Sequence, residues 1–207
     1  MQLGELAARG MVLAAGAKVF ASLGVRAATV EDILQVAGVS RRTFYRLYGN
    51  KEAVVDALYQ LGTERLLVTC RIVAQEKRDP LRRAERFIDA HLTNARDFGR
   101  LVFVLGGEAH SHESHLHRRR MEIQDALIDL LASTNKPPSA PAIDPLLIRG
   151  VLLALEAVTR RVLEEGDDGR KVTAAALDRA RGVMLRIATS ALAGKGAGVA
   201  PLPALER

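Results

Sequence analysis

Apolar residues recur every three to four positions along most of the chain, which places them on one face of an α-helix. Leu13, Ala17 and Phe20 follow this spacing within residues 5–23. Residues that commonly begin or end helices divide the rest of the chain into further predicted helices over residues 30–37, 41–47, 51–77, 81–96, 97–105, 114–132, 143–165 and 171–193. The helices at 81–96 and 97–105 could be one bent helix, and we expect Gly106 and Gly107 to break the pattern. No segment is typical of a β-strand, so the sequence predicts an all-α fold.

Two short helices with well-defined ends lie between Thr29 and Leu47. Thr29 is placed to cap the first helix, with Asp32 where a capping-box acid would lie. Gly38 is expected to end this helix, and Ser40 can cap the second. Two helices joined by such a tight turn form a helix-turn-helix, in which the second helix can enter the major groove of DNA.

The second of these helices has the side chains that a DNA-reading helix needs. Phe44 is placed to hold the two helices together, which leaves Arg41, Arg42 and Tyr45 facing outward. An arginine near the start of such a helix can bind two acceptors on a guanine edge, so the arginines, with Tyr45 beside them, are candidates for base contacts. The arginines could instead be solvated surface charges, and Tyr45 could pack at the edge of the core. The side chains suited to phosphate oxygens are those of Thr29, Thr43 and Lys51.

Residues 38–52, with the sequence GVSRRTFYRLYGNKE, resemble the DNA-binding signature of the tetracycline-repressor (TetR) family. The segments FASLG at 20–24 and TVEDI at 29–33 resemble the family's first and second helices. The resemblance implies a homodimer of about nine helices per subunit, in which each N-terminal domain binds one half-site of a palindromic operator. It also implies a C-terminal pocket for a small effector that usually releases the DNA. The family's base-facing positions correspond to Arg41, Arg42 and Tyr45, and its phosphate-facing positions to Thr29, Thr43 and Lys51.

The predicted helices and the resemblance together divide the chain into three parts. Residues 1–50 are expected to form the DNA-binding domain, residues 51–194 an effector-binding and dimerisation domain, and residues 195–207 a disordered tail. The last two helices have narrow apolar stripes with small residues, which could pair across a two-fold axis or form a core within one subunit. We favour the dimer, because a helix-turn-helix dimer needs a symmetric platform. The stripes consist of Val151, Leu155, Val158 and Val162, and of Leu177, Ala180, Met184, Ile187 and Ala191.

The effector pocket is expected among the helices that span residues 60–165. Five residues are candidates to line it, although each could equally belong to a core. They are Phe87, His91, Phe98, Phe103 and Leu105. Aromatic residues make up only 4% of the chain, which favours an aliphatic or acyl effector over a flat cationic one bound by stacking.

Composition narrows the class of protein further. The chain has 207 residues, a formal net charge of +6 and a single cysteine, so a disulfide framework or a cysteine-rich zinc site is excluded. The sequence has no phosphate-binding loop, dinucleotide fingerprint, nucleophile elbow or paired Cys/His site, so we expect neither an enzyme nor a bound cofactor. No uninterrupted apolar run approaches the ~18 residues of a membrane span, so we expect a cytoplasmic protein with no membrane partner. The positive charge permits double-stranded DNA as a partner but does not prove it.

Four of the five histidines lie between His110 and His117. If this segment is helical, Glu108, His112 and His115 share one face and could bind Zn²⁺ or Ni²⁺. The segment could instead be a solvated loop and helix start, because it follows two glycines and precedes three arginines. The alternatives to a repressor released by an organic effector are therefore a metal-responsive regulator that uses this cluster, and a non-specific, nucleoid-type DNA binder.

Overall fold

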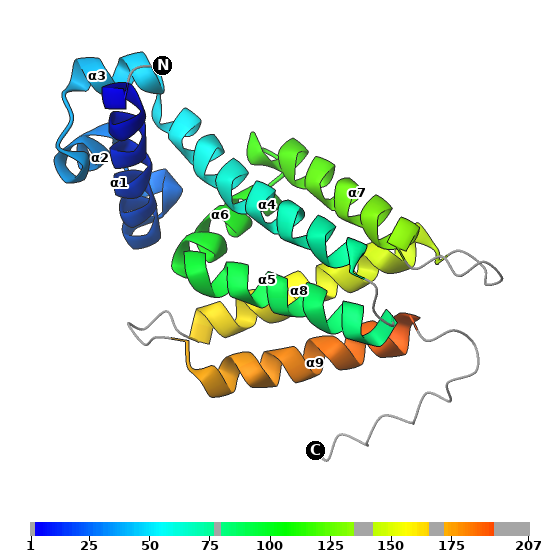
Figure 1. The fold of residues 1–207 in the computed structure, drawn as a ribbon. Coiled ribbons are helices and arrows are strands. Elements are labelled where there is room, and N and C mark those ends of the chain that lie inside the picture. The colour runs from blue at the N-terminus through cyan, green and yellow to red at the C-terminus, as the bar shows by residue number, and fades with distance from the viewer. Residues whose placement is uncertain (1–2, 77–79, 135–142, 166–171, 193–207) are drawn as a thin grey trace.

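The computed structural model of the chain describes residues 3–76, 80–134, 143–165 and 172–192 (Figure 1). All regular elements in these ranges are α-helices, which confirms the predicted all-α fold. In chain order they are α1 (Leu3–Ala27), α2 (Val30–Ala37), α3 (Arg41–Leu47), α4 (Lys51–Gln75), α5 (Pro80–Phe98), α6 (Arg100–His110), α7 (Leu116–Thr134), α8 (Pro145–Glu165) and α9 (Ala174–Leu192). The expected disordered tail, residues 195–207, lies outside the described residues.

Helices α1, α2 and α3 form one group at an end of the molecule, and α4 runs from this group into a bundle of the remaining helices (Figure 1). Phe20, Ile33 and Phe44, one from each helix of the group, are fully buried in the same core. Leu101 and Leu105 of α6 are buried in that core as well, so the first three helices pack directly on the bundle. Helices α8 and α9 lie side by side and antiparallel on the far side of the bundle, with α5 packed against α9.

The break between α5 and α6 lies at Gly99, not at Gly106 and Gly107. Gly99 adopts a positive φ of 50°, a conformation that favours glycine, between the two helices. Gly106 and Gly107 remain inside α6, which continues to His110. The prediction of a break at this pair was wrong, because glycine permits a break in a helix without requiring one, and α6 is held by packing against α1 and α7.

α1 is longer and more apolar than predicted. Gly24 interrupts its helical backbone at the predicted end, with φ 78° and ψ 164°, but a further turn continues to Ala27. The sequence predicts no membrane-spanning segment, because no uninterrupted apolar run is long enough. By length and composition alone, however, the helical segment Gly4–Ala27 is long and apolar enough to cross a membrane. Val12 and Phe20 of this helix are fully buried against neighbouring helices of the chain, as in the core helix of a folded domain.

The apolar stripes of α8 and α9 form a core within the subunit. Val151 and Leu155 of α8 and Met184 of α9 are buried together with Ile88 and Leu92 of α5. The prediction that these stripes pair across a two-fold axis was therefore wrong, because α5 covers their central residues. The two helices instead expose Leu146, Leu153 and Val183.

Gly16 allows α1 and α4 to pack closely. A Cβ at this position would lie 2.7 Å from Cγ1 of Val54, which is fully buried and, as a β-branched residue, stiff. We expect Gly16→Ala to lower the free energy of unfolding by about 1–3 kcal/mol. Gly10→Ala is the matched control on the same helix, because nothing lies within 4 Å of a Cβ there, and it should raise the free energy by about 0.5–1 kcal/mol. Denaturant unfolding followed by circular dichroism measures both, and a stabilising Gly16→Ala would contradict the close packing.

Candidate DNA interface and effector cavity

Thr29 and Asp32 hold the start of α2 through a reciprocal capping box. The Thr29 hydroxyl donates to Oδ2 of Asp32 at 2.7 Å, and the Thr29 backbone N–H donates to the same oxygen at 2.8 Å. The Asp32 backbone N–H in turn donates to the Thr29 hydroxyl at 3.2 Å. The hydrogen bonds from Thr29 lower the pKa of Asp32 below its usual value. The predicted capping box is therefore confirmed.

The turn between α2 and α3 sets the direction of the second helix. Gly38 adopts the left-handed conformation (φ 65°, ψ 23°) that favours glycine, and its N–H donates to the Leu34 carbonyl at 3.0 Å. The Ser40 hydroxyl accepts from the backbone N–H of Thr43 at 3.1 Å and so caps α3. Phe44 is fully buried in the core beneath this turn, which fixes α3 against the rest of the domain.

The outer face of α3 has the side chains that were predicted to contact bases. Arg41, Arg42 and Tyr45 are all exposed, and the Tyr45 ring packs edge-on against Phe44 with centroids 5.5 Å apart. Arg42 forms no ion pair or hydrogen bond with any described residue, so its guanidinium is available to a ligand. Arg41 instead forms an ion pair with Glu31 of α2, a partner that the sequence pattern did not indicate. A base contact by Arg41 therefore requires the guanidinium to exchange Glu31 for DNA.

The three residues predicted to bind phosphate each hold a helix end in the free protein. Thr29 belongs to the capping box, and the Thr43 hydroxyl lies 2.9 Å from the hydroxyl of the residue that caps α3. Nζ of Lys51 donates to the carbonyl oxygens of Val25 and Ala28, at 2.9 and 2.8 Å. The Lys51 ammonium thus joins the start of α4 to the end of α1. An ammonium has three N–H donors, so one remains that could reach a phosphate.

A cavity of about 1250 Å³ opens between the helices of the bundle. All five candidate pocket residues line it: Phe87, His91 and Phe98 from α5, and Phe103 and Leu105 from α6. Most of the remaining wall is aliphatic, with side chains from α4, α7, α8 and α9. A concave and largely apolar space of this kind suits a small organic ligand.

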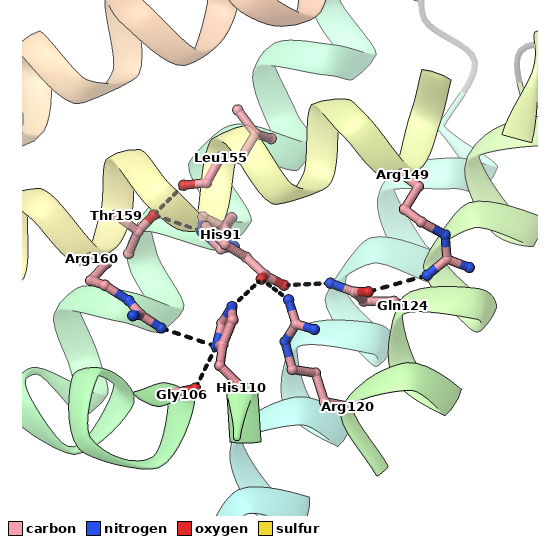
Figure 2. Close-up of polar contacts among 10 residues, drawn as sticks. His91, Gly106, His110, Arg120, Gln124, Arg149, Leu155, Thr159 and Arg160 are labelled. Carbon is pink, nitrogen blue, oxygen red and sulfur yellow. Dashed lines mark hydrogen bonds and ion pairs between the residues drawn. The ribbon is translucent and has the colours of Figure 1, made fainter. Parts of the chain in front are cut away.

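One part of the cavity wall is a polar network that was not predicted (Figure 2). Glu156 of α8 accepts hydrogen bonds from Nη2 of Arg120 at 2.6 Å and from Nε2 of Gln124 at 3.1 Å, both on α7. Nε2 of His110, at the end of α6, lies 3.5 Å from the same carboxylate. The network therefore joins three helices around one carboxylate. The sequence offered one signal for it, a single acid within the apolar stripe of α8.

His91 is half-buried in the same wall and bonded to α8. Its Nε2 lies 2.8 Å from the Thr159 hydroxyl, which in turn donates to the Leu155 carbonyl at 3.0 Å (Figure 2). Burial lowers the pKa of His91 below its usual value, with the carboxylate of Glu156 acting in the opposite direction. The ring is therefore neutral at neutral pH.

The histidine-rich segment does not form the shared helical face on which the metal hypothesis depended. Residues 111–115 form a non-helical connection between α6 and α7, so His112 and His115 do not lie on one helix. Nε2 of His115 lies 3.2 Å from Asp56 of α4, whereas the His112 ring packs against His117 with centroids 4.3 Å apart. Within the described ranges, no group of three or more His, Cys, Asp or Glu side chains is arranged to hold a metal ion.

Known proteins match part of the chain in sequence. A family model described as "Bacterial regulatory proteins, tetR family" matches residues 12–58. The HTH-type transcriptional repressor KstR2 of Mycobacterium tuberculosis is 34% identical over 77 residues, which cover 37% of this chain and 38% of that protein. The chain thus spans well under half the length of this curated relative.

Solved structures resemble the whole fold at lower identity. The fatty acid degradation regulator FadR from Bacillus halodurans is 20% identical, with a TM-score of 0.68 over 85% of this chain and 97% of that one. A TetR-like transcriptional regulator from Rhodococcus sp. RHA1 is 19% identical, with a TM-score of 0.68 over 91% and 97% of the two chains. At these identities the likeness concerns the fold alone. The N-terminal helix-turn-helix, within residues 12–58, therefore matches the tetR family of bacterial regulatory proteins, and the whole chain shares its fold with solved regulators of that kind.

Proposed function

We propose that this protein is a sequence-specific transcriptional repressor that binds a palindromic operator as a homodimer and is released when an apolar small molecule fills the cavity. One observation carries the proposal: the chain combines an exposed DNA-reading face on α3 with a large apolar cavity behind α4 and α6. The first feature suits the major groove, and the second suits a small ligand. The proposed partners are double-stranded DNA, the effector and a second copy of the chain, in the cytoplasm where the DNA lies.

Leu58, Leu101 and Leu105 support the coupling between the two sites. Each of them lines the cavity, and each is also buried in the core that carries α1, α2 and α3. A ligand that displaces these side chains therefore moves the support of the DNA-binding domain. Two recognition helices must keep a spacing of ~34–36 Å, or a multiple of it, to enter the grooves of two half-sites. A small shift at the cavity wall is then enough to weaken both half-site contacts together.

The lining of the cavity favours an effector with a largely aliphatic body. Aliphatic side chains make up most of the wall, and aromatic ones come mainly from α5 and α6. The name of one structural relative refers to the degradation of fatty acids, which are also aliphatic. The aliphatic lining of the cavity therefore supports an aliphatic or acyl effector over a flat cationic one.

The outward side of α8 and α9 supports the homodimer. Leu146, Leu153 and Val183 are exposed there, Leu146 to 72% of its surface. Gly150 and Gly182 lie on the same two helices with open space around them, so a partner helix can approach closely. A second copy of these helices would cover apolar side chains that the single subunit leaves exposed.

Selection of bound sequences from random DNA duplexes tests the proposal. At a fixed salt concentration near the physiological value, we expect a palindrome whose half-sites lie one helical turn, or a multiple of it, apart. Binding without a preferred sequence that fades as salt rises would contradict the proposal in favour of a non-specific binder. Absence of binding to any duplex would contradict both.

Arg42→Ala should relax the preference for one base pair in each half-site. The exposed guanidinium can bind two acceptors on a guanine, and this contact is worth about 1–3 kcal/mol of discrimination against the other bases. Titration of the recovered operator and of singly substituted duplexes, at matched salt, measures the change. Affinity for duplexes that already lack the preferred base should change much less.

Lys51→Ala is the comparison for Arg42→Ala. It should weaken binding to all sequences alike and flatten the dependence of log affinity on log salt by about one unit. Since Lys51 also donates to two carbonyls at the end of α1, the unfolding transition of this variant must be measured alongside its affinity. If the two variants changed specificity and salt dependence in the same way, the division into base and phosphate contacts would be wrong.

A further inference from the structure

The hydrogen bonds of Thr159 determine which ring nitrogen of His91 carries the proton. Thr159 has one hydroxyl hydrogen, and the Leu155 carbonyl, 3.0 Å away, can only accept it. Nε2 of His91, 2.8 Å from the same hydroxyl, must therefore be the donor in the second contact (Figure 2). A neutral ring that donates through Nε2 has a bare lone pair on Nδ1.

Nδ1 of His91 faces the cavity without a protein partner. Among the described residues, the ring makes no hydrogen bond besides the one to Thr159. His91 lines the cavity, and its Nδ1 is not among the unpartnered atoms that are sealed inside the protein. The nitrogen is therefore open to a molecule in the cavity, and it selects one that donates a hydrogen bond.

Asn94 adds a second polar group without a partner, one helical turn further along α5. Residues three apart on a helix lie on the same side, with Cβ atoms ~5–6 Å apart. Asn94 also lines the cavity, and its amide makes no hydrogen bond within the described ranges, although its Oδ1 is sealed inside the protein. The amide nitrogen offers two N–H donors, so one ligand oxygen can accept from Asn94 while it donates to His91.

We infer that the effector is a neutral, mainly apolar molecule with a hydroxyl group, which donates to Nδ1 of His91 and accepts from the amide of Asn94. This inference rests on the proposed function and narrows its effector class. A hydroxyl donates and accepts at a single uncharged atom. A carboxylate, ketone or ether has no hydrogen to give to Nδ1. An ammonium group would donate to Nδ1, but it has no lone pair with which to accept from the amide of Asn94.

Matched ligands of equal chain length test the inference on the full-length protein. Octanol, decanol and dodecanol are compared with the methyl ethers and the carboxylates of the same alkyl chains, by calorimetric titration without DNA. We expect each alcohol to bind about tenfold more tightly than its ether, because the ether leaves the buried acceptor of His91 unpaired. The carboxylates should bind no better than the ethers.

Three variants identify the side chains responsible. His91→Leu removes the Nδ1 acceptor and leaves the Thr159 hydroxyl its hydrogen bond to the Leu155 carbonyl, so this variant should bind alcohol and ether equally. Asn94→Leu should weaken alcohol and ether binding severalfold alike, because both ligand oxygens accept from the amide. Thr63→Val is the matched control, because Thr63 lines the cavity but its hydroxyl already donates to the Tyr59 carbonyl at 2.8 Å. The preference for alcohol should persist in this variant, and melting curves show whether each variant is folded.

Four results would overturn the inference: equal binding of alcohol and ether, tighter binding of carboxylates, no binding of any alcohol, or an alcohol preference that survives His91→Leu. The selection of DNA sequences is carried out without ligand. A failure of specific DNA binding therefore counts against the proposed function, whereas a failure of hydroxyl recognition with intact DNA binding counts only against this effector class.

Discussion

Glu156→Leu is expected to lower the free energy of unfolding by about 3–5 kcal/mol. The Arg120 side chain is only 9% exposed, and its guanidinium bonds to the Glu156 carboxylate at 2.6 Å. Removal of the acid leaves a buried positive charge without its counter-ion, and Gln124 loses an acceptor at the same time. Urea unfolding followed by circular dichroism measures the loss.

Two further variants separate the loss of this buried pair from other effects of the substitution. Arg120→Met combined with Glu156→Leu removes both charges and should recover most of the lost stability. Glu122→Leu removes the acid of an exposed pair with Arg118 on α7, whose side chains are 57% and 91% exposed, and should cost less than about 1 kcal/mol. If Glu156→Leu cost no more than Glu122→Leu, burial of the network would be irrelevant to stability.

Phe44→Ala should abolish specific DNA binding by releasing α3 from its domain. Phe44 is fully buried, and truncation of a buried phenylalanine costs about 3–5 kcal/mol. α3 has only 7 residues, so it depends on tertiary packing for its stability. The cost therefore falls on the helix that presents Arg42 to DNA.

Hydrogen exchange followed by mass spectrometry shows where Phe44→Ala acts. We expect faster exchange in α2 and α3, unchanged protection in α8 and α9, and loss of operator binding. Phe44→Leu retains most of the apolar volume and should keep most of the affinity. Wild-type operator affinity in Phe44→Ala would mean that other contacts hold α3 in place.

Helix ends could be predicted where a residue and its near neighbours decide them. Thr29 and Asp32 cap α2 through hydrogen bonds between residues three apart, so the sequence pattern and the bond lie in the same short segment. The break at Gly99 could not be predicted in this way. Gly99, Gly106 and Gly107 are equally able to adopt a positive φ, and packing of the surrounding helices decides which of them does.

The cavity-lining positions could be predicted, but their partners could not. Aromatic residues on α5 and α6 stood out in a chain that has few, yet a stripe of apolar residues does not show which helix it faces. The network around Glu156 joins it to Arg120 and Gln124, 36 and 32 positions earlier in the chain. For the same reason, Val151 and Met184 were assigned to a subunit interface although α5 covers them.

The leucines shared by the cavity and the core beneath α1, α2 and α3 limit which cavity positions can change without affecting the helix-turn-helix. A substitution at Leu58, Leu101 or Leu105 changes the core against which α1, α2 and α3 pack, in addition to any change in the cavity. Phe87 and His91 line the cavity from α5 but lie outside that core, so we expect substitutions there to leave operator recognition unchanged. If the cavity binds an effector as proposed, new ligand preferences, in natural evolution or in a designed biosensor, should therefore accumulate in the middle of α5 and spare Leu101 and Leu105 of α6.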